Sequence, residues 1–159
     1  MKYAIIGSGE IGTALARAFA RKKIEVAITN SRGPATLASL TKELGPNVVA
    51  QSLKDACKAE MTFLAVPFPA HPDVAKQFEH WDGKIVVDVT NTFQVGPEEL
   101  GGLLSSEVVS QAFVGARLVK AFNHLPAREL GRLDKGGTPL HFLAGQAGGL
   151  LFQNLEKLG

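Results

Sequence analysis

Short apolar runs alternate with amphipathic segments along the chain, a pattern typical of a parallel α/β sheet with helices on both faces. The runs are nearly continuous in Val, Ile, Leu and Ala, as expected of strands that are buried on both sides. We therefore predict a doubly wound, mostly parallel sheet. The predicted strands are Tyr3–Ile6, Ile24–Thr29, Val48–Gln51, Met61–Val66, Lys84–Val89, Leu118–Phe122 and Leu140–Ala144.

Apolar residues between these runs recur at helical spacing, which predicts a helix in each segment. The second segment lies between Gly33-Pro34 and Gly45-Pro46, a typical helix start and stop. Residues 91–104 contain Gly and Pro and read as a connection. We see no repeat or linker, so residues 1–159 form one predicted domain. The predicted helices cover residues 11–19, 37–44, Pro69–Phe78, Ser105–Phe113 and Gly148–Leu158.

Length and charge fit a small globular domain with a real core. The chain has 159 residues, 45% of them hydrophobic, and a net charge of +2, which gives no argument for a nucleic-acid partner. The basic run Arg21-Lys22-Lys23 falls where the first helix should end, where cations favour the helix dipole. The single Cys57 predicts no disulfide or metal site. With no long apolar run and no leader, we expect a soluble, cytoplasmic protein without a membrane partner.

The strongest local motif is G-x-G-x-x-G at Gly7, Gly9 and Gly12, between an apolar strand and an amphipathic helix. In this context Gly7 permits a tight turn, Gly9 lets a pyrophosphate approach the backbone, and Gly12 lets the helix pack on the strand. The helix N-terminus adds amide donors and partial positive charge. We predict a Rossmann-like dinucleotide-binding domain. Its candidate phosphate-binding residues are Gly7, Ser8, Gly9, Glu10 and Ile11.

The residue types at the end of the second predicted strand indicate which dinucleotide the domain binds. An NAD-type site usually carries a carboxylate there for the ribose hydroxyls. Here Thr29 is followed by Asn30, Ser31 and Arg32, without a carboxylate. Arg32 offers a fork of donors for a 2′-phosphate, Ser31 adds a hydroxyl, and Thr29 and Asn30 could assist at the ribose. We therefore predict NADP(H) over NAD(H), with a solvated loop arginine as the alternative for Arg32.

Four segments together resemble a known family. The turn GSGEIG, the NSR after strand two, VDVTN at Val87–Asn91 and LVKAFNHLPA at Leu118–Ala127 are similar to the NADPH-dependent coenzyme F-420 (deazaflavin) reductases. The last two also resemble the cytoplasmic NADPH domain of the six-transmembrane metalloreductases. The resemblance covers about residues 1–145. It implies an NADP-dependent oxidoreductase that passes a hydride from NADPH to a flavin or deazaflavin. Because the sequence has one Trp, one Tyr and no recognisable second mononucleotide site, we expect this acceptor to be a diffusible co-substrate.

The same resemblance implies where the cofactor lies. NADPH would cross the carboxyl ends of the strands, in keeping with the general rule for such sheets. The alternative for Val66 and Pro67 is a strand that simply ends at a proline, and for Asn91 a turn residue that caps its own backbone. The residues implied to line the path to the nicotinamide, or to border it, are Val66, Pro67, Phe68, Asn91, Ala121, Phe122 and Asn123.

Hydride transfer needs orientation of two rings rather than a nucleophile, so we predict no catalytic residue. His124 or His71 could face the acceptor, although an ordinary packing histidine is the simpler interpretation. Family members continue past this sequence with elements that help build the acceptor pocket and a dimer. We therefore expect a homodimer, formed through Leu140–Ala144 or the last helix. A non-catalytic NADP(H)-binding or sensing module is the alternative function, and an imine or hydroxy-acid dehydrogenase is a third.

Overall fold

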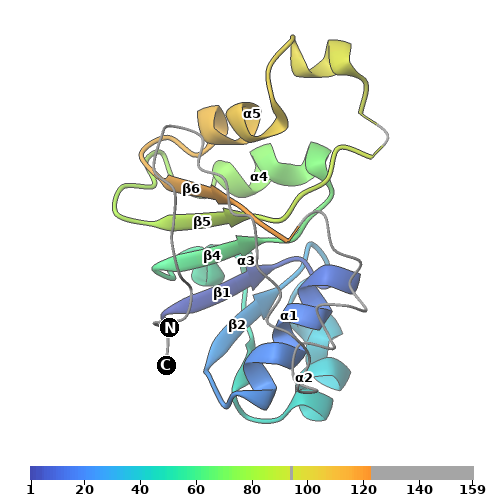
Figure 1. The fold of residues 1–159 in the computed structure, drawn as a ribbon. Helices are drawn as coiled ribbons and strands as arrows, with labels where there is room; N and C mark the ends of the chain where they lie inside the picture. Colours follow the sequence, from blue (N-terminus) through green and yellow to red (C-terminus); the bar gives the residue numbers. More distant parts are fainter. Residues whose placement is uncertain (94, 123–159) are drawn as a thin grey trace, which may run out of the picture.

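The computed structural model describes residues 1–93 and 95–122 of the chain. They form a six-stranded sheet in the order β3-β2-β1-β4-β5-β6, and every neighbouring pair is parallel (Figure 1). The chain starts in the middle of the sheet, builds one half outward, and returns beside β1 to build the other. The strands are β1 (Tyr3–Ile6), β2 (Val26–Thr29), β3 (Val48–Ala50), β4 (Met61–Leu64), β5 (Ile85–Asp88) and β6 (Arg117–Lys120). This is the doubly wound Rossmann-like fold predicted from the sequence.

Helices cover both faces of the sheet, and alternate strand residues point to each. On one face Leu15 of α1 packs with Ile5 and Val87, and on the other Val109 of α5 packs with Ile6 and Val86. The helices are α1 (Glu10–Arg21), α2 (Ala38–Leu44), α3 (Leu53–Ala56), α4 (His71–Ala75) and α5 (Ser105–Ala112), with 3₁₀ turns η1 (Pro34–Leu37), η2 (Phe68–Ala70) and η3 (Pro97–Leu100).

Most predicted elements are present: β1 has the predicted bounds, the other strands are shorter than predicted, and α1 is longer. The helix expected over Pro69–Phe78 begins as the turn η2 and ends at Ala75. Helix α3 was not predicted, because four residues are too few to show a helical period. Its N-cap Ser52, whose side chain accepts a hydrogen bond from the Asp55 amide, was a usable signal. The predicted strand Leu140–Ala144 and the predicted helix Gly148–Leu158 lie outside the described residues.

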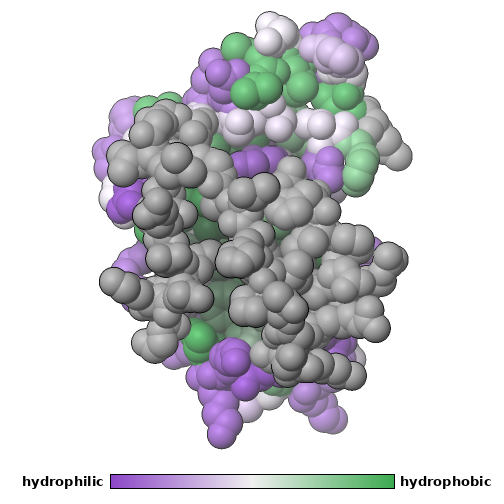
Figure 2. Space-filling view, viewed as in Figure 1, coloured by the Kyte–Doolittle hydropathy of each residue, from purple (hydrophilic) through white to green (hydrophobic). Residues whose placement is uncertain are grey.

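The segment between β5 and α5 leaves large apolar side chains exposed. Phe93 is 80% exposed and Leu104 69%, and hydrophobic surface gathers over this segment in Figure 2. Cys57, by contrast, is fully buried. Within the described ranges, no helix has the length and apolar character needed to span a bilayer.

A candidate dinucleotide cleft at the carboxyl ends of the strands

Two neighbouring cavities lie where the strand order reverses between β1 and β4. The smaller one, about 370 Å³, reaches from the glycine turn to the loop after β2, and we call it the adenosine-end cavity. The larger one, about 540 Å³, reaches toward the residues after β5, and we call it the nicotinamide-end cavity. A topological switch point of this kind is where open α/β sheets bind ligands. The two cavities share lining residues, namely Gly9, Ala65, Val66 and Pro67.

Each glycine of the turn is required for a different physical reason. Gly7 adopts φ +113°, and a Cβ there would lie 2.0 Å from the Ala65 carbonyl oxygen. A Cβ on Gly12 would lie 2.0 Å from the Gly7 carbonyl oxygen, so α1 could not approach β1. Gly7 also donates its amide to the Thr29 carbonyl at 2.9 Å, which ties the turn to β2. A side chain at Gly7 or Gly12 would therefore distort the turn itself.

Gly9 differs because the position of its would-be Cβ has no atom of the described residues within 4 Å. The residue lines both cavities and precedes α1, which starts at Glu10. The first amides of a helix have no partner within the helix, and they carry partial positive charge. The empty space over Gly9 therefore fits a phosphate group held by the start of α1.

Asn30 organises the loop after β2. Its side-chain amide donates to Ser8 Oγ and to Thr36 Oγ1, each at 3.1 Å. Its carbonyl oxygen accepts the Arg32 backbone amide at 3.0 Å. The sequence interpretation placed Asn30 at a ribose, whereas in the structure its side chain links this loop to the glycine turn. Asn30 therefore positions both segments on either side of the adenosine-end cavity.

The other residues predicted for the adenosine end differ in whether their side chains are exposed to the cavity or buried. Ser31 and Arg32 are exposed and line the adenosine-end cavity, as a site for a phosphate requires. Thr29 is completely buried, and its carbonyl rather than its side chain serves the glycine turn. Sequence reasoning did not single out Leu53 or Asp73, which also line this cavity. Both come from short helices whose placement depends on packing against the sheet.

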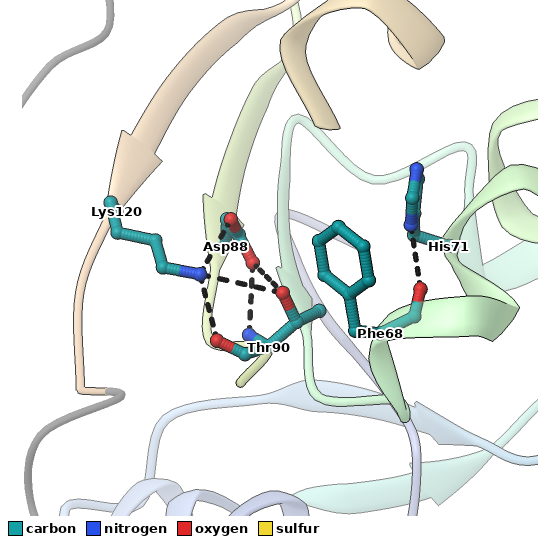
Figure 3. A network of polar contacts seen from close by, with 5 residues as sticks. All are labelled: Phe68, His71, Asp88, Thr90 and Lys120. Carbon is teal, nitrogen blue, oxygen red and sulfur yellow. Dashed lines mark hydrogen bonds and ion pairs between the residues drawn. The ribbon is translucent and has the colours of Figure 1, made fainter. Parts of the chain in front are cut away.

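The wall between the two cavities comes from the segment after β4. Val66 and Pro67 line both, and Phe68 lines the nicotinamide-end cavity although it is only 6% exposed. His71 holds this segment: its Nδ1 lies 2.6 Å from the Phe68 carbonyl oxygen, and its ring is 4.8 Å from the Phe68 ring (Figure 3). His71 is 4% exposed. It is thus a packing histidine, the simpler of its two sequence interpretations.

A network of charged and polar groups lies at the ends of β5 and β6. The Lys120 ammonium is 2.9 Å from Asp88 Oδ2 and donates to the Thr90 carbonyl at 2.7 Å (Figure 3). Asp88 Oδ1 accepts the amide and the hydroxyl of Thr90. Asn91 follows directly and lines the nicotinamide-end cavity. Asp88 and Lys120 belong to the two segments VDVTN and LVKAFNHLPA that carry the family resemblance, but the sequence alone assigned neither residue a role.

The remaining predicted residues lie at the end of β6. Ala121 is buried, and Phe122 lies with its ring 6.4 Å from that of Phe63. Neither is among the lining residues of the two cavities. Phe122 has φ +64°, a left-handed conformation that is uncommon for an aromatic residue. Asn123 and His124 lie outside the described residues.

Some lining residues of the nicotinamide-end cavity were not among the predicted site residues, Phe93 and Val95 among them. Phe93 and Val95 line it, and Phe93 keeps most of its ring exposed. They follow β5 in the segment that read only as a connection. Within the part of the chain that the structure describes, Glu10 is the sole charged side chain lining this cavity. Its walls are otherwise apolar or contain a neutral amide, which suits a planar ring.

The comparisons with known proteins agree with this geometry. Residues 2–92 match the model of the family "NADP oxidoreductase coenzyme F-420-dependent", which is more than half of the chain. The chain therefore belongs to this family of NADP oxidoreductases, as its motifs suggested. No curated protein matches it.

Several solved structures are similar. A hypothetical protein from Sinorhizobium meliloti is 48% identical, with TM-score 0.79 over 86% of this chain and 68% of that one. A protein from Arthrobacter sp. FB24, described as a candidate F-420-dependent NADP reductase, is 26% identical, with TM-score 0.67 over 80% of this chain and 64% of that one. A reductive aminase from Aspergillus terreus, solved with NADPH, is 20% identical, with TM-score 0.62 over 80% and 42%. At that identity it shows the fold alone.

Proposed function

We propose that the chain binds NADP(H) across the two cavities and transfers a hydride between NADPH and a flavin or deazaflavin-type acceptor. The observation that carries the proposal is the pair of adjoining cavities, which share Gly9 and connect Arg32 at one end to Asn91 at the other. Arg32, Gly9 and Asn91 follow one another along the edge of the sheet in the same order as the 2′-phosphate, the pyrophosphate and the nicotinamide of the cofactor. Membership of an NADP oxidoreductase family supports this assignment.

The adenosine-end cavity favours a 2′-phosphate. Ser31 and Arg32 are exposed at its edge, and the Asn30 side chain fixes the backbone from which they project. A guanidinium binds phosphate oxygens through charge-assisted, bidentate hydrogen bonds. Asp73 also lines this cavity, and its carboxylate is paired with Lys76 at 3.0 Å, which reduces its repulsion of an anion. We therefore expect NADPH to bind more tightly than NADH.

In the nicotinamide-end cavity the residues of the chain would orient rings rather than react. Pro67 and Phe68 offer an apolar wall, Asn91 an amide for orientation, and Phe93 a further aromatic surface on the open side. Bound NADPH supplies the hydride, and the protein's part is to hold the acceptor against it and exclude water. The acceptor would stack between the nicotinamide and the apolar surface near Phe93.

Hydride transfer is tested by following loss of nicotinamide absorbance in purified protein with NADPH and a panel of riboflavin, FMN, FAD and a deazaflavin. We expect at least one acceptor to accelerate oxidation above its rate in protein-free buffer, and NADH to be a poorer donor. If none does while NADPH still binds in calorimetric titration, the chain is a non-catalytic NADP(H)-binding module and the enzyme assignment fails.

We also propose that the protein acts as a homodimer. The exposed Phe93 and Leu104 add apolar surface beside the cleft, of a kind that often marks an interface. A monomer in light scattering at high micromolar concentration would contradict this.

A further inference from the structure

A buried ion pair lies beside the nicotinamide-end cavity but does not line it. The Asp88 side chain is completely buried and the Lys120 side chain is 16% exposed. The two residues are directly opposite in the register of β5 and β6. A buried pair of charges does not by itself stabilise a fold, because desolvation offsets much of the attraction. Its presence at this strand end therefore calls for another physical reason.

The hydrogen bonds of the pair converge on Thr90. Lys120 Nζ donates to the Thr90 carbonyl at 2.7 Å, and it lies 3.4 Å from the Thr90 hydroxyl. Asp88 Oδ1 accepts the Thr90 amide at 2.9 Å and its hydroxyl at 2.7 Å. The amide, carbonyl and hydroxyl of one residue are thus all held by the ion pair. Two apolar side chains could fill the same volume, but they would leave these polar groups of Thr90 unsatisfied.

Thr90 lies between two lining residues of the cavity, Val89 and Asn91. Fixing its backbone therefore fixes the strand end that forms this part of the wall. We propose that Lys120 is a positioning residue: together with Asp88 it clamps Thr90 and so sets the geometry of the nicotinamide end of the cleft, without touching the cofactor. This inference rests on the proposed function, since it assumes that a nicotinamide binds there.

The test separates the two ends of the cofactor. The fragment 2′,5′-ADP contains only the adenosine end, whereas NADPH contains both. In Lys120→Met, we expect calorimetry to show NADPH affinity about tenfold lower, because Thr90 no longer holds the wall in place against the nicotinamide, and 2′,5′-ADP affinity unchanged. Lys120→Arg keeps the charge and a donor, so it should recover part of the loss.

The matched control is Lys84→Met. Lys84 also donates to a backbone carbonyl, that of Ala59 at 3.0 Å, but it precedes β5 at the opposite edge of the sheet. It should leave the affinity for both ligands unchanged. If thermal melting shows that Lys120→Met does not fold, the double variant Asp88→Asn/Lys120→Met takes its place, because it removes both charges of the pair. The same loss of NADPH affinity is expected of this double variant.

The outcomes separate the two hypotheses. Two outcomes would show that the positioning role is wrong while the proposed function stands, provided that the wild type binds both ligands. In the first, the folded Lys120 variants bind NADPH as tightly as the wild type does. In the second, they lose affinity for NADPH and 2′,5′-ADP equally. If the wild type binds neither ligand, the proposed function fails and this inference fails with it. Loss of NADPH affinity in Lys84→Met as well would show a general effect of stability and would also overturn the positioning role.

Discussion

The two ends of the cleft are built in opposite ways. At the adenosine end, Ser31 and Arg32 are exposed, and the loop that carries them is held by hydrogen bonds from the neutral Asn30 side chain. At the nicotinamide end, the strand end is held by the buried charges of Asp88 and Lys120. The first region presents its functional groups to solvent, whereas the second hides its charges behind an apolar wall.

The difference fits what each end would recognise under the proposed function. A phosphate is charged and is bound best by exposed donors that can close on it. The nicotinamide ring of NADPH is neutral and must be placed accurately for hydride transfer, so a fixed wall matters more than charge there. Changes at the adenosine end should therefore alter which cofactor binds, and changes at the nicotinamide end should alter how it is held.

The largest effect is expected at the junction of the two cavities. Gly9→Val fills the space of the pyrophosphate and should lower the affinity for NADPH and NADH at least about a hundredfold. Because no atom of residues 1–93 and 95–122 lies within 4 Å of the new Cβ, the melting temperature should stay near that of the wild type. Gly12→Val is the contrast: its Cβ would collide with the Gly7 carbonyl, so it should unfold the turn. Undiminished binding by Gly9→Val would show that the glycine is structural only.

Arg32→Ala tests the adenosine end. It removes the donors to the 2′-phosphate, so NADPH affinity should fall about tenfold or more while NADH affinity barely changes. Calorimetric titration with both cofactors measures the difference. Arg17→Ala serves as a control, since Arg17 pairs with Glu43 on the surface and lines neither cavity. Equal losses for the two cofactors in Arg32→Ala would contradict the assignment.

Phe93→Ala tests the open side of the nicotinamide end. Loss of one aromatic stacking surface should raise the KM for the acceptor about fivefold and leave NADPH affinity unchanged. The control is Val114→Ala, which removes another exposed apolar side chain that does not line the cavity. Steady-state rates at several acceptor concentrations provide the measurement. An unchanged KM would remove Phe93 from the acceptor surface.

The smallest effect is expected at Cys57, which lines neither cavity and where burial raises the pKa of the thiol to about 12 from an ordinary 9.0. Above pH 9.0 the unfolded thiol ionises while the folded one keeps its proton, so the free energy of unfolding should fall as pH rises toward 12. Cys57→Ala should reduce this dependence in denaturant titrations. At pH 8 the folded thiol should resist alkylation, which gives a check that variants at either end keep their fold.

A good part of this protein follows from local sequence. Gly7 and Gly12 could be assigned because their requirements, a positive φ and a close helix–strand approach, are properties of a short segment. The strands and long helices follow from hydrophobic periodicity, and the absence of a carboxylate after β2 depends only on a few consecutive residues. Each of these features can be predicted from residues that are close together in the chain, although the close approach of Gly7 to the Ala65 carbonyl arises only in the sheet.

Tertiary structure decided the rest. Asp88 and Lys120 are 32 residues apart, and they meet because the sheet order places β6 next to β5 in a particular register. Phe93 reads as part of a connection, and its exposure beside the cavity depends on where the strand before it ends. Sequence periodicity says which residues are buried, but not which buried partner each will meet. That choice belongs to the packing of strands whose positions are fixed only when the whole sheet forms.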